Sequence, residues 1–530
     1  MRIHDDPSIP AAQENETQAK AVIRRQIAAL GIRRKWEHIF DECYELTMPG
    51  RETFAIQTGG DVRTDRIFDE TAVTGLPEFA SRLQAGLMPT FAEWTSLAAG
   101  SDVPEDEVEQ VNADLKTITK KMFETLRNSN FNQEVHETFM DLGVGTGCLL
   151  ALEGDAVEPI HWAAIPLPRV AFNIGPTGTI DAIYREHSLR LDQITQIWRR
   201  AKFSPDVVQK SKSNPDQKFL VVEEELRDRT KVEPTYDYKV VLKSEEEIIH
   251  EERYSGIGSS PWIVFRWSKA SGEVYGRGPV LNTLPAIKTL NLTIQLILEN
   301  ADQSIQGLWQ YDDDGIINVD TIELDPGTVI PRSPGTRGLE PLENPGRLDV
   351  AQLILDDMRH NVRKAMFNEG LGAPEGTPMS ATEVSSRMAD LARQIGSAFG
   401  RLQYELVTPV IQRVIYVLKK KGIIQTPQAD GRIIKIVATS PLSRAQVEQE
   451  ITDMERYAMT LVQMFGPQLA QIFIDHENYA LTLASKLDLD AGIVRPKAER
   501  EQIAQAIAQA AQQQAQAAPQ QGAQQGPPAQ

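Results

Sequence analysis

Two short motifs in this chain are of kinds that bind phosphate or calcium. Gly143-Val-Gly-Thr-Gly147 is glycine-rich but lacks the Lys-Ser/Thr of a phosphate-binding loop. It also follows a helical pattern, so we predict a turn that ends a helix. Asp312-Asp-Asp-Gly315 begins like a calcium loop. The first and last ligands of that loop would be Gln310 and Thr321, which do not fit the EF-hand pattern, so we predict a solvated turn.

The remaining reactive side chains form no catalytic constellation. The eight histidines lack the spacing of a metal motif such as HExxH. Cys43 and Cys148 lie in no nucleophile motif, and two cysteines suit a reducing compartment with no disulfide framework. We therefore predict that the chain is not an enzyme and uses no metal and no cofactor.

A long helix without such chemistry is predicted after a loop rich in Gly and Pro, within residues 370–422. Ser380 and Glu383 form a capping box at its start. Apolar residues then recur every three or four positions, which is typical of one helix face. Pro409 is expected to kink this helix. At about 1.5 Å per residue, some 40 residues span roughly 60 Å, which favours an elongated protein.

A basic cluster lies on the helix expected before this loop and consists of Arg359, His360, Arg363 and Lys364. Arg359 and Arg363 are four residues apart and share a helix face. Two interpretations stay open. The cluster is a surface stripe that pairs with Asp356 and Asp357, or it contacts phosphate or a neighbouring subunit.

A turn-rich insert at 306–347 carries aromatic and basic residues, namely Trp309, Tyr311, Arg332 and Arg337. Exposed aromatics and arginines suit a protein interface, whereas the same residues would also pack the insert's own core. Both interpretations stay open.

The composition bounds the class of protein. The 530 residues leave room for several domains, and a hydrophobic content of 41% is ordinary for a globular protein. A net charge of −19 argues against a protein that coats DNA, but not against one that lets DNA slide past. The most apolar run, residues 279–298, contains Asn, Gln, Lys and Pro, so we predict a packed helix and no membrane span.

The periodicity predicts a mixed first half and a mainly helical second half. Helices are expected at 16–48, 70–88, 104–128, 130–150 and 189–202, and strands within 155–190, 218–254 and 261–267. Later helices are expected at 279–304, 349–367, 380–418 and 442–486, with a short strand within 431–440. The end of the chain, from Ala517, is predicted to be disordered because it contains almost only Ala, Gln, Gly and Pro.

This order of parts resembles the head-to-tail connector, or portal, proteins of short-tailed bacteriophages of the T7 type. The likeness is spread over residues 20–465, in motifs that are weak singly but occur in order: Asp69-Glu-Thr-Ala72, Leu87-Met-Pro89 with Trp94, Gly145-Thr-Gly147, Ile165-Pro-Leu167, Gly272-Glu-Val-Tyr-Gly276 with Gly278-Pro279, Met379-Ser-Ala-Thr-Glu-Val384, Arg401-Leu402 through Pro409 to Arg413, and Ser440-Pro-Leu-Ser-Arg-Ala-Gln446.

The resemblance implies a mainly α fold with α+β parts that forms a ring of about twelve subunits. Its implied parts are a mixed α/β wing (1–275), a first stem helix (276–305), a clip (306–347), a second stem helix (348–367), a tunnel loop (368–379), a long kinked helix and strand returning to the wing (380–440), a helical crown (441–500) and a largely disordered Ala/Gln-rich tail (501–530).

The resemblance also implies a location and partners. The ring is expected at one capsid vertex of the virion, and in the host cytoplasm during assembly. It is expected to contact double-stranded DNA transiently and without sequence preference, a terminase motor, a tail adaptor protein, and capsid and scaffolding proteins. The DNA-channel candidates are Arg359, Arg363, Lys364, Pro374, Glu375 and Thr377, and the clip residues Trp309, Tyr311, Arg332 and Arg337 are candidates for the adaptor interface.

Two other classes of function stay open from the residues alone. A nucleic-acid-processing enzyme would need the phosphate loop or metal cluster that the motifs lack. A helical scaffold or internal virion protein would suit the long helices and the Ala/Gln tail, but not the strand-rich first half. Rings with a central hole in electron micrographs would favour the portal.

Overall fold

The computed structural model describes residues 11–51, 53–54, 64–104, 107–155, 157–306, 309–310, 340–341, 348–368, 395–396, 398–425, 433–486, 500 and 503. The chain divides into two compact units, Met1–Leu442 and Ser443–Gln530. The first unit combines helices and two main sheets, which agrees with the expected mainly α fold with α+β parts.

Four long helices open the first unit at the positions that the periodicity predicts. They are α1 (Ala11–Thr47), α2 (Thr71–Leu87), α3 (Val108–Arg127) and α4 (Phe131–Val144). On α2, Leu76, Phe79 and Leu83 are spaced by three and four residues and are almost fully buried in the largest core cluster. This is the apolar face expected of an amphipathic helix.

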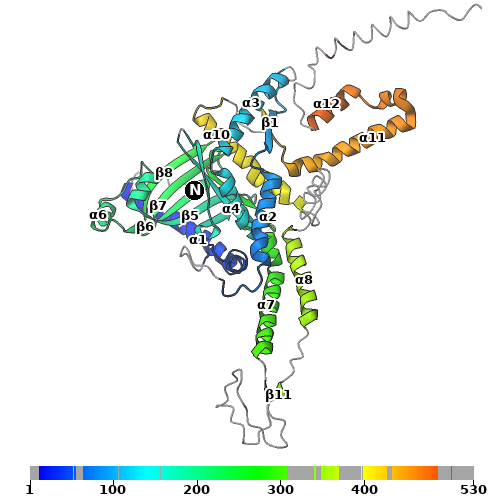
Figure 1. Ribbon diagram of the computed structural model, residues 1–530. Coiled ribbons are helices and arrows are strands. Elements are labelled where there is room, and N and C mark those ends of the chain that lie inside the picture. The colour runs from blue at the N-terminus through cyan, green and yellow to red at the C-terminus, as the bar shows by residue number, and fades with distance from the viewer. Residues whose placement is uncertain are drawn as a thin grey trace, which may run out of the picture. The chain divides into compact units, whose positions relative to one another are not determined.

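A five-stranded antiparallel sheet has the order β4-β5-β6-β7-β8. Its strands are β4 (Val170–Ile174), β5 (Ile180–Arg190), β6 (Lys218–Arg227), β7 (Thr235–Leu242) and β8 (Glu247–Ser255). The helix α1 lies against this sheet (Figure 1). Ala19 and Val22 of α1 pack against Val222 and Val241 on one of its faces. Two short helices, α5 (Leu191–Ile197) and α6 (Pro205–Ser213), follow β5; α5 is shorter than the predicted 189–202, and α6 was not predicted.

A second sheet has the order β3-β2-β9, with β2 (Thr146–Glu153), β3 (Ile160–Ala164) and β9 (Trp262–Arg266). The predicted helix over 130–150 is therefore wrong beyond Val144, where α4 ends in the expected glycine turn. A Cβ at Gly145 would lie 2.1 Å from the carbonyl oxygen of Gly276. Glycine thus allows the close approach of these two backbones.

A third pairing joins residues far apart in the sequence. β1 (Thr95–Ala99), which was not predicted, pairs antiparallel with β12 (Ile434–Ala438), and Leu97 lies opposite Ile436. The short strand expected within 431–440 is confirmed. This pairing brings the chain, after its helical middle part, back beside the residues that follow α2.

Two helices run side by side in that middle part, α7 (Pro279–Gln306) and α8 (Leu348–Ala365) (Figure 1). Both helices were predicted. Between them, β10 (Trp309–Gln310) pairs with β11 (Glu340–Pro341). On α8, Leu355 and Val362 are buried, and Met366, directly after the helix, is buried in the same cluster.

The second unit contains the remainder of α11 (Pro441–Phe473) and all of α12 (His476–Lys486), so the helices predicted over 442–486 are confirmed. Gly466 interrupts α11 with a φ of 77°, a conformation that favours glycine. No helix among the described residues is long and apolar enough to cross a membrane.

Candidate functional site

The α7–α8 pair is fixed to one short stretch of chain before α2. Asn291 of α7 accepts hydrogen bonds from the backbone N–H groups of Phe68 and Asp69 and donates one to Arg66. Arg359 of α8 donates to the Asp69 carboxylate at 2.9 Å. Asp69 is 8% exposed and also accepts from the N–H of Thr71 at the start of α2. One segment therefore positions both helices.

This contact corrects one interpretation of the basic cluster. The predicted partners of Arg359, Asp356 and Asp357, are wrong, because its ion-pair partner is Asp69. Arg363 and Lys364 are exposed at the end of α8, and their side chains contact no partner of opposite charge among the described residues. Their charges are thus available at the surface of the single chain.

The residues that follow α8 are anchored firmly. Phe367 has a φ of 60°, unusual for a bulky side chain, and its carbonyl accepts from Arg82 at 2.9 Å. Its ring lies 5.6 Å from that of Trp267. Asn368 donates to the carbonyl of Gly75 at 2.7 Å. The strained φ persists because these contacts determine it.

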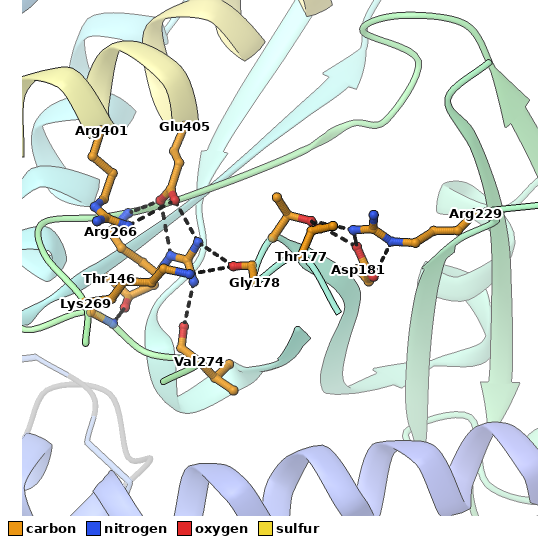
Figure 2. A network of polar contacts seen from close by, with 12 residues as sticks. Thr146, Thr177, Gly178, Asp181, Arg229, Arg266, Lys269, Val274, Arg401 and Glu405 are labelled. Carbon is orange, nitrogen blue, oxygen red and sulfur yellow. Dashed lines mark hydrogen bonds and ion pairs between the residues drawn. The ribbon is translucent and has the colours of Figure 1, made fainter. Parts of the chain in front are cut away.

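A second anchor holds the helical residues that resume at Ile395. Glu405 accepts two hydrogen bonds from the guanidinium of Arg266, at 2.7 and 3.2 Å, and one from its N–H. Figure 2 shows this pair, with the carbonyls of Val274 and Gly178 also accepting from Arg266. The Arg266 side chain is 2% exposed, and Arg401 lies 3.7 Å from the same carboxylate.

The two anchors meet on adjacent residues of one strand end. Arg266 holds Glu405, and Trp267 contacts Phe367. Lys269, close by, donates to the carbonyl of Gly178 at 2.7 Å. Burial, and then the charges of Arg266 and Arg401, lower the pKa of Lys269. The arrangement fixes backbone positions and offers no paired acid and base, so it supports a positioning role.

The long helix is irregular beside Pro409. Gln403–Val407 forms a π segment, and α10 (Thr408–Lys420) follows with helical backbone angles at Val407 and Thr408. The N–H of Thr408 donates to the carbonyl of Gln403, five residues earlier. Pro409 has no N–H to continue the α-helical ladder, so the π segment accommodates it without a break. A bend at Pro409 stays a prediction.

Several predicted site residues lie outside the described residues: Tyr311, Arg332, Arg337, Pro374, Glu375, Thr377, Ser380 and Glu383. Trp309 lies in β10, opposite Pro341. Their assignments to the clip, the tunnel loop and the helix cap stay predictions.

The sequence analysis missed Asp69, Arg266 and Glu405 as partners. Asp69 lies in a quoted motif, but its partner Arg359 is 290 residues away. Arg266 ends an apolar strand, and Glu405 interrupts an apolar helix face. A single charge within an apolar pattern was the available signal, since buried charges need partners.

The cysteines and acidic groups add no reactive site. Cys43 and Cys148 are buried and form no disulfide, and burial raises the pKa of the Cys43 thiol to about 12. Burial also raises the pKa of Cys148. No group of His, Cys, Asp and Glu side chains suited to a metal ion occurs within the described ranges.

Sequence comparison decides the family. The model of the family described as "Bacteriophage head to tail connecting protein" matches residues 19–494. The chain belongs to this family. This connector is similar to the "Probable portal protein" of Bordetella phage BPP-1, with 23% identity over 536 residues that cover 92% of this chain and 93% of that protein. It is also similar to the "Portal protein" of Salmonella phage epsilon15, with 23% identity over 476 residues that cover 84% and 85%.

Two solved structures share more distant similarity with the connector. One is the neck of an empty gene transfer agent particle, at 13% identity and a TM-score of 0.35, covering 79% of this chain and 92% of that chain. The other is the virion of a native gene transfer agent particle, at 11% and 0.34, covering 74% and 88%. The family assignment rests on sequence, and with it the connector has a portal function in a phage capsid.

Proposed function

We propose that about twelve copies of this connector form a ring at one capsid vertex, around a channel for double-stranded DNA during packaging and ejection. Family membership supports this proposal, as does the side-by-side placement of α7 and α8 on one anchoring segment. Repeated around a ring, two such helices per subunit line a tube. The subunits' net charge of −19 would repel phosphates and keep DNA mobile.

The parts of the chain take the roles that the resemblance implies. Residues 1–275 and the returning strand form the wing, α7 and α8 the stem, 306–347 the clip, 368–379 the tunnel loop and 441–500 the crown. The clip binds the terminase motor and then the tail adaptor protein. Capsid and scaffolding proteins contact the ring outside the channel. The ring works without enzymatic activity, cofactor or membrane, in the virion and before that in the host cytoplasm.

The observation that carries the DNA contact is the exposed pair Arg363 and Lys364 at the end of α8. Both side chains are exposed and have no acidic partner among the residues described. They lie three to four residues before the anchored Phe367, where the proposed tunnel loop begins. Two cations per subunit give local, non-specific phosphate contacts within an acidic channel.

Charge reversal tests this role. We expect Arg363→Glu with Lys364→Glu to leave ring formation intact but to reduce packaged DNA by about tenfold, because phosphates are then repelled at the channel wall. DNA protected from nuclease in filled capsids is the measurement. Lys120→Glu with Lys121→Glu, an equally exposed lysine pair on α3, is the charge-matched control. Equal packaging by both double variants would overturn the assignment.

The enzyme alternative has its own test. A nucleic-acid-processing enzyme would hydrolyse ATP or cut DNA as the purified connector alone. We expect neither activity in the wild-type ring, with or without added Mg²⁺. ATP turnover by the pure ring that is lost on mutation of one of its own residues would contradict the structural role.

A further inference from the structure

One strand edge of the five-stranded sheet is bare. β4 pairs with β5 only from Ile180 to Arg185, whereas β6 pairs with β5 as far as Arg190. Residues 186–190, here called the β5 edge, therefore have a strand neighbour on one side only within the described part of the chain. At about 3.4 Å per residue the β5 edge is roughly 17 Å long.

The residues before β4 explain why its pairing stops. Continued backwards, the register would place Pro168 opposite His187. Proline has no N–H to donate to a neighbouring strand. Instead, Leu167–Arg169 forms a 3₁₀ turn, and Arg33 donates to the carbonyls of Pro168 and Val170 at 2.8 Å each. The chain before β4 therefore leaves the strand ladder at this turn.

The register also shows which backbone groups face outward. The N–H of Lys243 donates to the carbonyl of Leu220, so Leu220 faces β7. Backbone groups alternate along a strand, hence the odd-numbered residues of β6 face β5. Their partners, such as His187, face β6. Glu186, Ser188 and Arg190 therefore direct their N–H and C=O groups away from β6. The register places Arg169 opposite Glu186, and the N–H of Arg190 donates to the Gln193 side chain at 3.0 Å. Ser188, between them, directs its N–H and C=O groups to the bare side with no described strand opposite.

A large, positively charged cavity adjoins the β5 edge. It has a volume of about 1970 Å³ and is lined by residues 186–189. Ten Arg or Lys but only five Glu side chains line it, although the whole chain is strongly acidic. Arg34, Arg199, Arg200 and Lys202 are exposed and form no ion pair with described residues. The cavity therefore suits an acidic occupant.

We propose that the β5 edge accepts an extended acidic segment of a second copy of this chain as an added strand. An unpaired strand edge binds the backbone of an extended peptide, so a polypeptide fits this site better than DNA does. An uncovered edge is also prone to aggregation unless something pairs with it. A second copy is acidic, at −19, and in a ring two different surfaces of neighbouring subunits meet. The inference rests on the proposed ring.

Hydrogen exchange on the wild-type connector gives the first test. We expect the amide of Ser188 to exchange freely in the monomer and about tenfold more slowly in the ring, as one added hydrogen bond predicts. Unchanged exchange in a well-formed ring would overturn the inference and leave the proposed function standing. Protection already present in the monomer would also overturn it. Failure of the wild type to form rings would overturn both.

A proline variant gives the second test. Ser188→Pro removes an outward N–H and blocks strand addition, while the hydrogen bonds between β5 and β6 are kept. We expect a folded monomer whose assembly, measured by analytical ultracentrifugation, requires at least about tenfold more protein. Ser188→Thr keeps the N–H and is the matched control. If the Pro variant unfolds, the exchange measurement decides; if it assembles like the control, the inference is wrong.

Discussion

Two glutamates on the same face of β6 show how partners decide the charge of a buried carboxyl. Burial raises the pKa of Glu225 to about 7, with only a partial offset from the Ser260 hydroxyl and Arg413. Burial pushes the pKa of Glu223 upward too. Hydrogen bonds and charges from His187, Arg185 and Tyr238 outweigh that effect and lower it. The two carboxyls, two residues apart on one strand, therefore change the stability of the fold in opposite directions as the pH changes.

Glu225→Gln tests the raised pKa. The folded chain holds the Glu225 proton up to about pH 7, whereas the unfolded chain loses it near 4.5. Stability from this group is thus full below pH 4.5 and is lost as the pH rises to 7. The Gln variant should match the wild type at pH 4.5 and exceed its unfolding free energy by up to about 3 kcal/mol at pH 8. Denaturant unfolding across this range is the measurement.

Glu223→Gln is the matched control, on the same strand face. Its lowered pKa contributes stability above the unfolded value of 4.5, which is lost as the pH falls through the folded value. The Gln variant should therefore be less stable than the wild type at pH 7, by about 3 kcal/mol for a broken buried pair. The difference should shrink in acid. Parallel pH profiles for the two variants would contradict both assignments.

Arg266→Met tests the buried anchor. Its removal leaves the Glu405 carboxylate, 12% exposed, with Arg401 at 3.7 Å as its remaining cation. We expect a loss of about 3 kcal/mol in unfolding free energy. Adding Glu405→Met should restore most of it, because no unpaired charge then remains. Arg229→Ala removes the more exposed pair with Asp181 and should cost less than about 1 kcal/mol. Equal losses of unfolding free energy for the two arginine variants would contradict the anchoring role of Arg266.

At the scale of elements, the periodicity of apolar residues predicted those helices whose positions the local sequence determines. The helices α2, α7 and α8 carry apolar stripes on one face, and their positions are confirmed. β2 was misread because Cys148 to Ala151 are buried on both faces, so the strand shows no alternation. The partner of Arg359 could not be predicted, since a contact across 290 residues leaves no local signal.

The tether between α8 and α2 yields an element-scale prediction. Arg359→Ala leaves the buried Asp69 carboxylate with the N–H of Thr71 as its one remaining donor among the described residues. We expect a loss of about 1–2 kcal/mol and faster amide exchange along α8. Arg363→Ala, four residues on and exposed, should change stability by less than about 0.5 kcal/mol. If Arg363→Ala loosens α8 as much as Arg359→Ala, then Asp69 is not the tether.

At the scale of the whole molecule, the two units differ in how they bury apolar residues. The four buried core clusters found within the described residues all lie in Met1–Leu442. In the second unit, Met459, Met464 and Ile472 are 64%, 70% and 74% exposed. The first unit therefore holds the stability of the single chain.

A chain that ends after Leu442 tests this division. Because it keeps every one of those clusters, its thermal midpoint should lie within about 4 °C of the full chain's main transition. The separate fragment 443–530 should stay helical by circular dichroism but bind a hydrophobic dye and melt without a sharp transition. Since the β5 edge and the α7–α8 pair belong to the first unit, the shortened chain should still form rings. A shortened chain that folds but stays monomeric would move the main subunit contacts to the second unit and its exposed apolar residues.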